Sequence, residues 1–215
     1  MAKKKKKKVS KRKIRNFILV LILILLIIGV IFGLKSSFTN KKKAQADVKV
    51  EDKLEDYGYE LMENESKYYK DLFNELKGVL SESEVDEEKY ASLVGQLFLS
   101  DFFHLKNKIS RNDIGGTGFV YESYRSDFEK KAKDGVYRYV ESNIYGDRKQ
   151  DLPEVASVSI DNIEQIEYEY LDEVDDEAYS LDATISYVKD MGYQEQATLI
   201  LVHHNNKLEI VKMSE

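Results

Sequence analysis

An uninterrupted apolar segment near the start of the chain constrains this protein more than any other feature. Residues 17–34 read FILVLILILLIIGVIFGL, eighteen apolar residues without a charge. As a helix they would extend about 27 Å, close to the ~30 Å hydrocarbon layer of a bilayer, and the flanking Arg15 and Lys35 can snorkel to its surfaces. A helix in a soluble core would carry a polar stripe, which this segment lacks. We therefore expect a transmembrane helix over residues 17–34.

The basic residues on the two sides of this segment predict its orientation. Ten Lys and Arg lie within residues 1–16, four more follow between residues 35 and 43, and no acidic residue precedes Asp47. The more positive flank of a membrane helix stays in the cytoplasm. We therefore expect residues 1–16 to be a cytoplasmic tail resting on anionic lipid, and the chain beyond residue 34 to be extracytoplasmic. A lysine run can also bind nucleic acid, but the topology signal is the favoured interpretation and no nucleic-acid partner is expected.

The same segment has a second interpretation, a cleaved signal peptide. Ala44-Gln45-Ala46 has the small-x-small form of a cleavage site, but it lies well beyond Leu34, with four lysines between. The apolar run also exceeds the 7–15 residues usual for a signal-peptide core. An uncleaved anchor is therefore favoured.

The rest of the chain differs sharply in charge. Residues 47–215 hold 19 basic and all 39 acidic residues, a net charge of −20. We expect a polar stalk over 35–52 and one domain over 53–215, long enough to bury about two-thirds of its unfolded surface. The chain has no cysteine, which excludes disulfides, thiolate nucleophiles and zinc–thiolate sites.

Hydrophobic periodicity predicts helices in the first half of this domain. Apolar side chains recur at spacings of three and four over Leu54–Leu80, Val85–Leu105 and Tyr124–Val140. Ser83 is the expected N-cap of the second helix. Gly115 to Gly118 predict a turn before the third.

After Asn143 the period changes to two, which predicts strands. These strands contain Val158 and Ile160, then Ile166 to Tyr170, Leu181 to Tyr187, Thr198 to Val202, and Leu208 to Met213. The expected links, 171–178, 189–194 and a hairpin turn at Asn205-Asn206, are too short for parallel crossovers. We expect an α+β domain with helices followed by a curved antiparallel sheet.

This order of elements resembles the cone of the nuclear transport factor two-like, or cystatin-like, superfamily. A cone outside a single N-terminal anchor is similar in layout to bitopic assembly proteins of type IV secretion and conjugation systems. Segments such as NDIGGTGFV and ESNIYGDRKQDLPEV resemble uncharacterised anchored proteins of low-GC Gram-positive bacteria. Resemblance to the conjugation proteins implies that the domain is a protein-docking module. In the enzymatic cones it implies an acid or a His–Asp pair in the cavity.

Four groups of residues are candidates for a catalytic or binding site. Asp101 and His104 share a helical face, as an Asp orienting a general base would; a surface ion pair, or an isolated histidine at the helix end, is favoured. His203 and His204 point to opposite faces of a strand and cannot share a metal. The acidic run 172–177 lacks the calcium-loop spacing. Gly115 to Gly118 lack the P-loop lysine. We therefore assign no catalytic, cofactor-binding or metal-binding residue, and no cofactor.

The function expected from the sequence is presentation of an acidic protein-interaction domain outside the cell by a single-pass anchor, as in an envelope, secretion or conjugation assembly. Its partners would be the bilayer, another protein, or a second copy of the chain. The first alternative is a ligand-binding or catalytic cone with its site in the cavity, and the second is a stalked surface structural protein without a pocket. Alternation further places Leu199 and Leu201 on the helix-covered face of a central strand. Ile200 and Val202 lie on the other face, where Val202→Ala should be mild in the isolated domain.

Overall fold

The structure is a computed structural model that describes residues 48–215. The predicted tail (1–16), the predicted transmembrane helix (17–34) and most of the predicted stalk (35–52) lie outside these residues. Within 48–215, no helix is long and apolar enough to cross a membrane.

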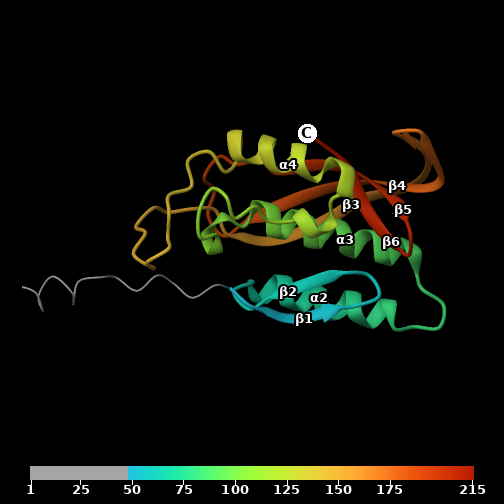
Figure 1. The fold of residues 1–215 in the computed structure, drawn as a ribbon, viewed down its shortest axis with the longest axis horizontal. Helices are drawn as coiled ribbons and strands as arrows, with labels where there is room; N and C mark the ends of the chain where they lie inside the picture. Colours follow the sequence, from blue (N-terminus) through green and yellow to red (C-terminus); the bar gives the residue numbers. More distant parts are fainter. Residues whose placement is uncertain (1–47) are drawn as a thin grey trace, which may run out of the picture. The chain divides into compact units, whose positions relative to one another are not determined.

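A four-stranded antiparallel sheet forms the second half of the described chain, as the change of period predicts. Its strands lie in the order of the sequence (Figure 1). They are β3 (Val155–Tyr170), β4 (Glu173–Tyr187), β5 (Gln196–His204) and β6 (Lys207–Ser214). The predicted Asn205-Asn206 turn is confirmed: Asn205 has a φ of 58°, which asparagine tolerates better than most residues. The sheet is curved, and with the helices it makes an α+β domain.

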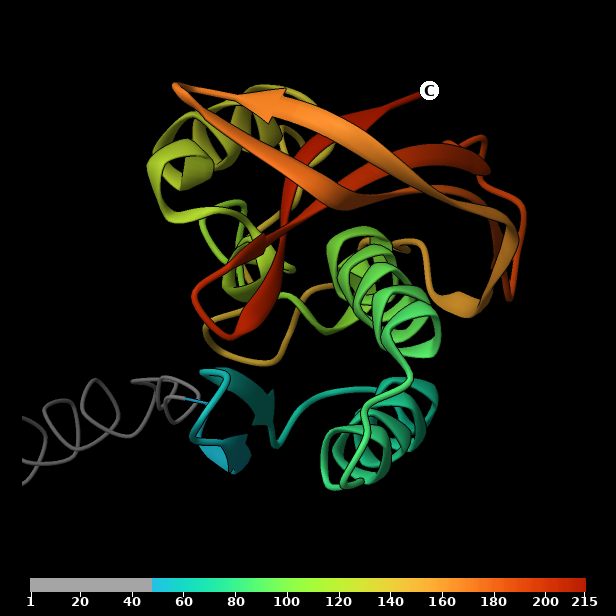
Figure 2. The same cartoon turned by 90° about the vertical axis from the view of Figure 1, so that its right-hand side faces the viewer.

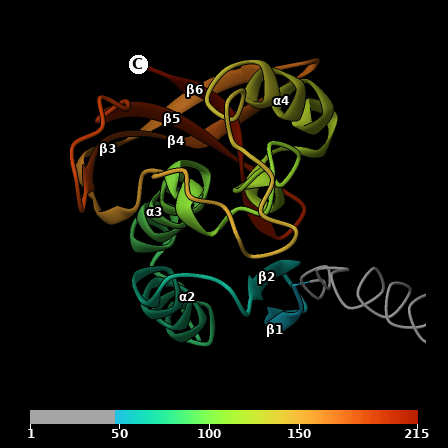
Figure 3. The same ribbon diagram turned by 90° about the vertical axis from the view of Figure 1, so that its left-hand side faces the viewer.

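Helix α3 (Glu87–Phe103) lies in the hollow of this sheet, and α2 (Lys67–Leu80) covers the side of α3 that faces away from it (Figures 2 and 3). Because α3 is covered on both sides, most of its side chains are buried, which explains its wide apolar stripe. The helix begins after Asp86, whose carboxylate accepts a hydrogen bond from Lys89 N at 3.0 Å. Asp86, not Ser83, is therefore the N-cap.

A β-hairpin precedes α2, where the sequence predicted a helix from Leu54 onward. Strands β1 (Val50–Leu54) and β2 (Tyr59–Met62) pair antiparallel around Gly58, whose φ is +71°. The hairpin begins inside the predicted stalk. Its buried anchor is Tyr59, whose hydroxyl lies 2.8 Å from the Tyr90 hydroxyl and donates to the Leu208 carbonyl at 2.7 Å. These contacts tie the hairpin to α3 and β6.

The segment between α3 and the sheet holds two short 3₁₀ turns, η1 (Leu105–Asn107) and η2 (Thr117–Phe119), and helix α4 (Glu122–Asp134). The predicted third helix, 124–140, is therefore too long at its C-terminus. The helix stops before Gly135, whose N–H bonds back to the carbonyls of Lys131 and Ala132.

The acidic run 172–177 is strand from Glu173 onward and not the predicted loop. Strand β4 begins at Glu173, directly after a tight turn at Leu171, whose φ is 51°. Tyr170 pairs with Glu173 and Tyr168 with Asp175 in the β3–β4 register. The acidic side chains therefore extend the long β3–β4 hairpin.

The two faces of β5 are both buried. Leu199 and Leu201 lie in the main core with α3, as predicted. Val202 lies on the other face and is 0% exposed, because it packs in a second cluster with Tyr121, Tyr170 and Ala178. The expectation that Val202 is open in the isolated domain is wrong: Tyr121, at the start of α4, covers that face.

Candidate functional site

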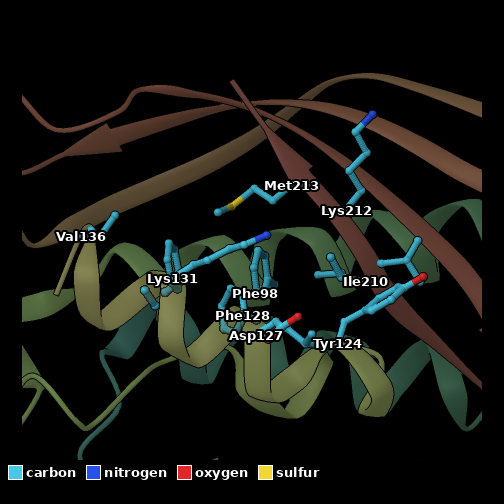
Figure 4. Close-up of a pocket in the computed structure, with 14 residues that line it drawn as sticks. Phe98, Tyr124, Asp127, Phe128, Lys131, Val136, Ile210, Lys212 and Met213 are labelled. Carbon is cyan, nitrogen blue, oxygen red and sulfur yellow. The ribbon is translucent and has the colours of Figure 1, made fainter.

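The sheet, α3 and α4 enclose a groove of about 520 Å³, which we call the α4–β6 groove (Figure 4). Most of its lining is apolar: Phe98, Phe102, Val120, Tyr124, Phe128, Ala132, Val136, Ile210, Val211 and Met213. Its three charged side chains, Asp127, Lys131 and Lys212, belong to residues exposed at the surface. In Figure 4 the Lys131 side chain reaches toward the middle of the groove, while Lys212 points away.

The groove forms because α4 is anchored to the body mainly at its middle and first turn. Phe128 contacts the rings of Phe98 and Phe102, with centroids 5.8 and 5.2 Å away. Arg125 donates from Nη2 to the Val120 carbonyl at 3.2 Å. Ala132 is the only residue of α4 that is fully buried. The helix therefore stands over β6 and leaves an apolar space beneath it.

A second cavity, of about 510 Å³, lies beneath the β1–β2 hairpin, and we call it the hairpin pocket. Its polar floor holds a buried ionic cluster of Glu65, Asp101 and Lys108. The Lys108 ammonium contacts the Asp101 carboxylate directly and lies 3.9 Å from Glu65 Oε1. The Lys108 and Glu65 side chains are only 4% and 6% exposed. One cation is thus shared between two acids from different elements.

Burial changes the pKa values of this cluster in opposite directions. Burial, and then the charge of Asp101, raise the pKa of Glu65 to about 7. Burial alone would lower the pKa of Lys108, but the nearby Asp101 and Glu65 carboxylates outweigh it and raise that pKa. The folded domain therefore keeps Lys108 charged, while Glu65 is part protonated near neutral pH.

The Gly115–Gly118 loop uses its donors within the protein. Gly115 N–H donates to the Tyr137 hydroxyl at 2.9 Å, and Gly116 N–H donates to Asp101 Oδ2 at 2.6 Å. Gly116 has a φ of +76°, a conformation that suits glycine. These N–H groups are thus not aimed at a phosphate, in line with the favoured turn interpretation.

Asp101 and His104 do not form the pair that would orient a general base. Asp101 binds Lys108 and Gly116 N–H. His104 caps α3, is 6% exposed, and its Nδ1 has no hydrogen-bond partner among the described residues. Burial, and then the charge of Lys108, lower the pKa of His104. Nor do the two residues form a surface ion pair; the structure has the other expected arrangement, an isolated histidine at the helix end, and this histidine is buried.

His203 and His204 have separate partners on opposite faces of β5, as alternation predicts. His203 lies 3.0 Å from Asp175 Oδ2, and His204 Nδ1 lies 2.6 Å from the buried Glu209 carboxylate. Burial alone would raise the pKa of Asp175, but N–H groups of His203 and Glu177 and the His203 ring outweigh it and lower that pKa. Within 48–215 no three His, Asp or Glu residues are placed to hold a metal ion.

Sequence reasoning missed both cavities. Glu65 fell inside a predicted helix, and Lys108 lay in a segment without periodicity. Of the three residues in the ionic cluster, only Asp101 carried a sequence signal, and that signal paired it with His104 and not with Lys108. Lys131 lay on a predicted helix and Lys212 on a predicted strand, with nothing to show that the two elements meet.

Comparisons with family models, with curated proteins and with solved structures found no match to this chain.

Proposed function

We propose that this chain is a single-pass membrane protein that presents an acidic domain outside the cytoplasm, and that the domain docks an extended segment of a partner protein in the α4–β6 groove. The anchor and its orientation rest on the apolar segment 17–34 and its unequal basic flanks. The observation that carries the docking function is the open edge of β6 beside an apolar groove.

Strand β6 has β5 on one side along its length. On its other side, Tyr121 N–H donates to the Ile210 carbonyl at 3.0 Å, and Val120 forms a parallel bridge with Ile210. The chain then turns away into α4. Among the described residues, no strand lies beside 211–214 on that edge. An unpaired edge is a template for a further strand, and a bound segment would continue the pairing that Val120 begins.

The groove also specifies the chemistry of the segment. Alternate side chains of an added strand would point toward the aromatic rings of Phe98 and Phe128 and the thioether of Met213. Lys131 and Lys212 outnumber Asp127 at the rim, so this region is locally basic on a domain of net charge −20. We therefore propose a segment of alternating apolar residues that also carries an acidic residue.

Docking is favoured over catalysis in this groove because its charged residues are exposed. A catalytic or ligand-binding cavity is expected to hold a buried acid or histidine with a polar partner. The cavity that meets this criterion among the described residues is the hairpin pocket, since the buried Glu209, which pairs with His204, lines neither cavity. The second candidate function, binding of a small polar ligand, is therefore supported at the hairpin pocket by Glu65.

Peptide display on the domain tests the docking proposal. Extended peptides selected on residues 44–215, the compact unit of the structure, should share alternating apolar residues and an acid. Binding should slow hydrogen exchange at the amides of residues 211–214. Lys131→Glu should weaken binding at least several-fold, while Lys189→Glu, at an exposed lysine elsewhere, should not. Selected peptides that protect another surface would refute docking at β6.

Protease treatment of intact wall-free cells tests the topology separately. Loss of the domain, with a known cytoplasmic protein left intact, is the expected result. Full protection of the domain, while a known outer protein is cut, would reverse the proposed orientation.

A further inference from the structure

The loop between α4 and β3 carries an exposed tip of large hydrophobic side chains. Ile144 and Tyr145 are 43% and 53% exposed, and nearby Tyr139 is 74% exposed. Gly146 N–H bonds to the Asn143 carbonyl at 2.9 Å, so Ile144 and Tyr145 occupy the two corner positions of a tight turn. Those positions are usually filled by Gly, Pro, Asn, Asp or Ser. Two large apolar side chains there are costly to leave in water.

The loop that holds this tip is firmly braced. Arg148 donates to the carbonyls of Lys106 at 2.8 Å and Lys108 at 2.7 Å, near the C-terminal end of α3. Asn143 N–H donates to the Ile109 carbonyl at 2.6 Å. The loop therefore presents the tip in a fixed direction without collapsing to bury it.

The tip lies at the end of the domain where the described chain begins. Val48 and Ile109 line the same hairpin pocket, and Ile109 holds Asn143 of the tip loop. Figure 1 shows the loop and the first described residues at the same, left-hand end of the domain. The tip is therefore on the side from which the chain leads back to residues 17–34.

The intervening chain is short. Residues 35–47 are thirteen residues, and thirteen residues span at most about 45 Å when fully extended. A tether of this length keeps the tip at a high effective concentration near the bilayer. Even a weak membrane contact would therefore be populated.

The charge of the tip loop suits a lipid surface. Residues 138–149 contain Arg138, Arg148 and Lys149 against Glu141 and Asp147, a net charge of +1 on a domain of −20. Anionic lipid therefore does not repel this loop, as it would repel the domain as a whole. Tyrosine side chains are enriched where proteins meet the bilayer–water boundary.

We propose that Tyr139, Ile144 and Tyr145 enter the interfacial layer of the bilayer and hold the domain in one orientation against it. This inference rests on the proposed function, since it requires the anchor at residues 17–34. It adds a second membrane contact, made by the folded domain itself. The contact would fix which way the α4–β6 groove faces.

The absence of native cysteine allows a direct test. The full chain carrying Ile144→Cys, labelled with an environment-sensitive fluorophore, is reconstituted into vesicles of phosphatidylcholine and phosphatidylglycerol with shallow spin-labelled lipid. The matched control is Leu171→Cys. Leu171 is also an exposed turn residue, 54% exposed, but its turn adjoins Asp175, which reaches the start of α3 through His203 and Glu87. The control label is therefore at the opposite end of the domain.

The label at residue 144 should be quenched at least several-fold more than the label at 171, and a label at Tyr145→Cys should repeat the result. Equal, weak quenching of both labels in chains that float with the vesicles would overturn the inference and leave the anchor intact. Chains that do not float with the vesicles would refute the anchor, and with it the inference. A change in the fluorescence of the label at residue 144 that depends on protein density but not on spin-labelled lipid would indicate contact between copies of the chain. That result would also overturn the inference.

Discussion

Because the Glu65 carboxyl is buried, we expect the folded domain to lose stability as the pH rises, and we expect Glu65→Gln to remove this loss. The pKa of Glu65 rises from 4.5 in the unfolded chain to about 7 in the folded domain. At 1.36 kcal/mol for each pKa unit, a shift of about 2.5 units corresponds to about 3 kcal/mol. Because the side chain is only 6% exposed, solvent screening reduces this magnitude little.

The sign follows from which state binds the proton more tightly. Between pH 4.5 and about 7 the unfolded chain releases the Glu65 proton while the folded domain retains it, so the stability of the domain falls as pH rises. The loss is absent below pH 4.5 and complete above about pH 7. Glutamine cannot ionise and can still accept the hydrogen bond from Asn107 Nδ2, which is 3.2 Å from Glu65 Oε2.

Urea denaturation of residues 44–215 at several pH values between 4 and 8 measures this effect. The free energy of unfolding of Glu65→Gln, relative to the unsubstituted domain, should increase by about 3 kcal/mol between pH 4 and pH 8. Titration of His104 affects both proteins alike and cancels in this difference. Glu63→Gln, at an exposed neighbour, is the matched control for the substitution itself. A pH-independent difference for Glu65→Gln would refute the burial argument, and a decrease would mean that Lys108 dominates the environment of Glu65.

Three further predictions concern the stability of the same domain, measured by urea denaturation at pH 7. Lys108→Met should cost about 3–5 kcal/mol, because it leaves Glu65 and Asp101 buried without their cation. Lys106→Met, at an exposed pair with Glu154, should cost far less; similar small losses for both would mean that the cluster is hydrated. Val202→Ala should cost about 2 kcal/mol by opening a cavity in the second cluster. Val188→Ala, at a 65% exposed site, should cost about 0.5 kcal/mol or less. Equal costs for the two substitutions would mean that the Val202 face of β5 is open to solvent. Tyr137→Phe removes the hydroxyl that donates to the Phe102 carbonyl at 2.7 Å and accepts from Gly115 N–H, so it should cost about 1–3 kcal/mol, while Tyr139→Phe should be neutral.

The sequence predicted those elements whose local pattern agrees with their tertiary surroundings. Helix α3 is buried on both sides, so its apolar residues recur without ambiguity. The face assignment of Leu199 and Leu201 follows from strand alternation alone. Links shorter than a crossover required antiparallel strands, and the sheet has them.

The hairpin was missed because its pattern coincides with a helical one. Leu61 lies seven residues before Tyr68, a spacing that would place both on one face of a helix. In the structure, however, Leu61 belongs to strand β2 and is buried in the main core. The turn signal at Asp56-Tyr57-Gly58 was present inside the predicted helix and outweighs that spacing. The acidic residues of β4 were read as a loop because strand propensity disfavours Asp and Glu, but pairing along the long β3–β4 hairpin prevails.

The cavities could not be predicted from local pattern, because each depends on residues far apart in the chain. Glu65 and Lys108 are separated by a helix pair, and nothing in either segment shows that one reaches the other. The α4–β6 groove likewise depends on how far α4 stands from the sheet, which is set by the contacts of Phe128 and not by its own periodicity.

The burial of Val202 bears directly on where a partner can bind. The sequence placed a docking face on the outer side of β5, but Tyr121 and Tyr170 already cover Val202 there. A partner would have to displace these side chains before it reached the strand. The β6 edge needs no such displacement, because the segment that pairs with Ile210 leaves it after Tyr121. Tyr121 thus has two effects: its ring closes the outer face of β5, and the turn into α4 that it begins leaves residues 211–214 open. Tyr121 therefore blocks a partner from the outer face of β5 and leaves the edge of β6 open to one.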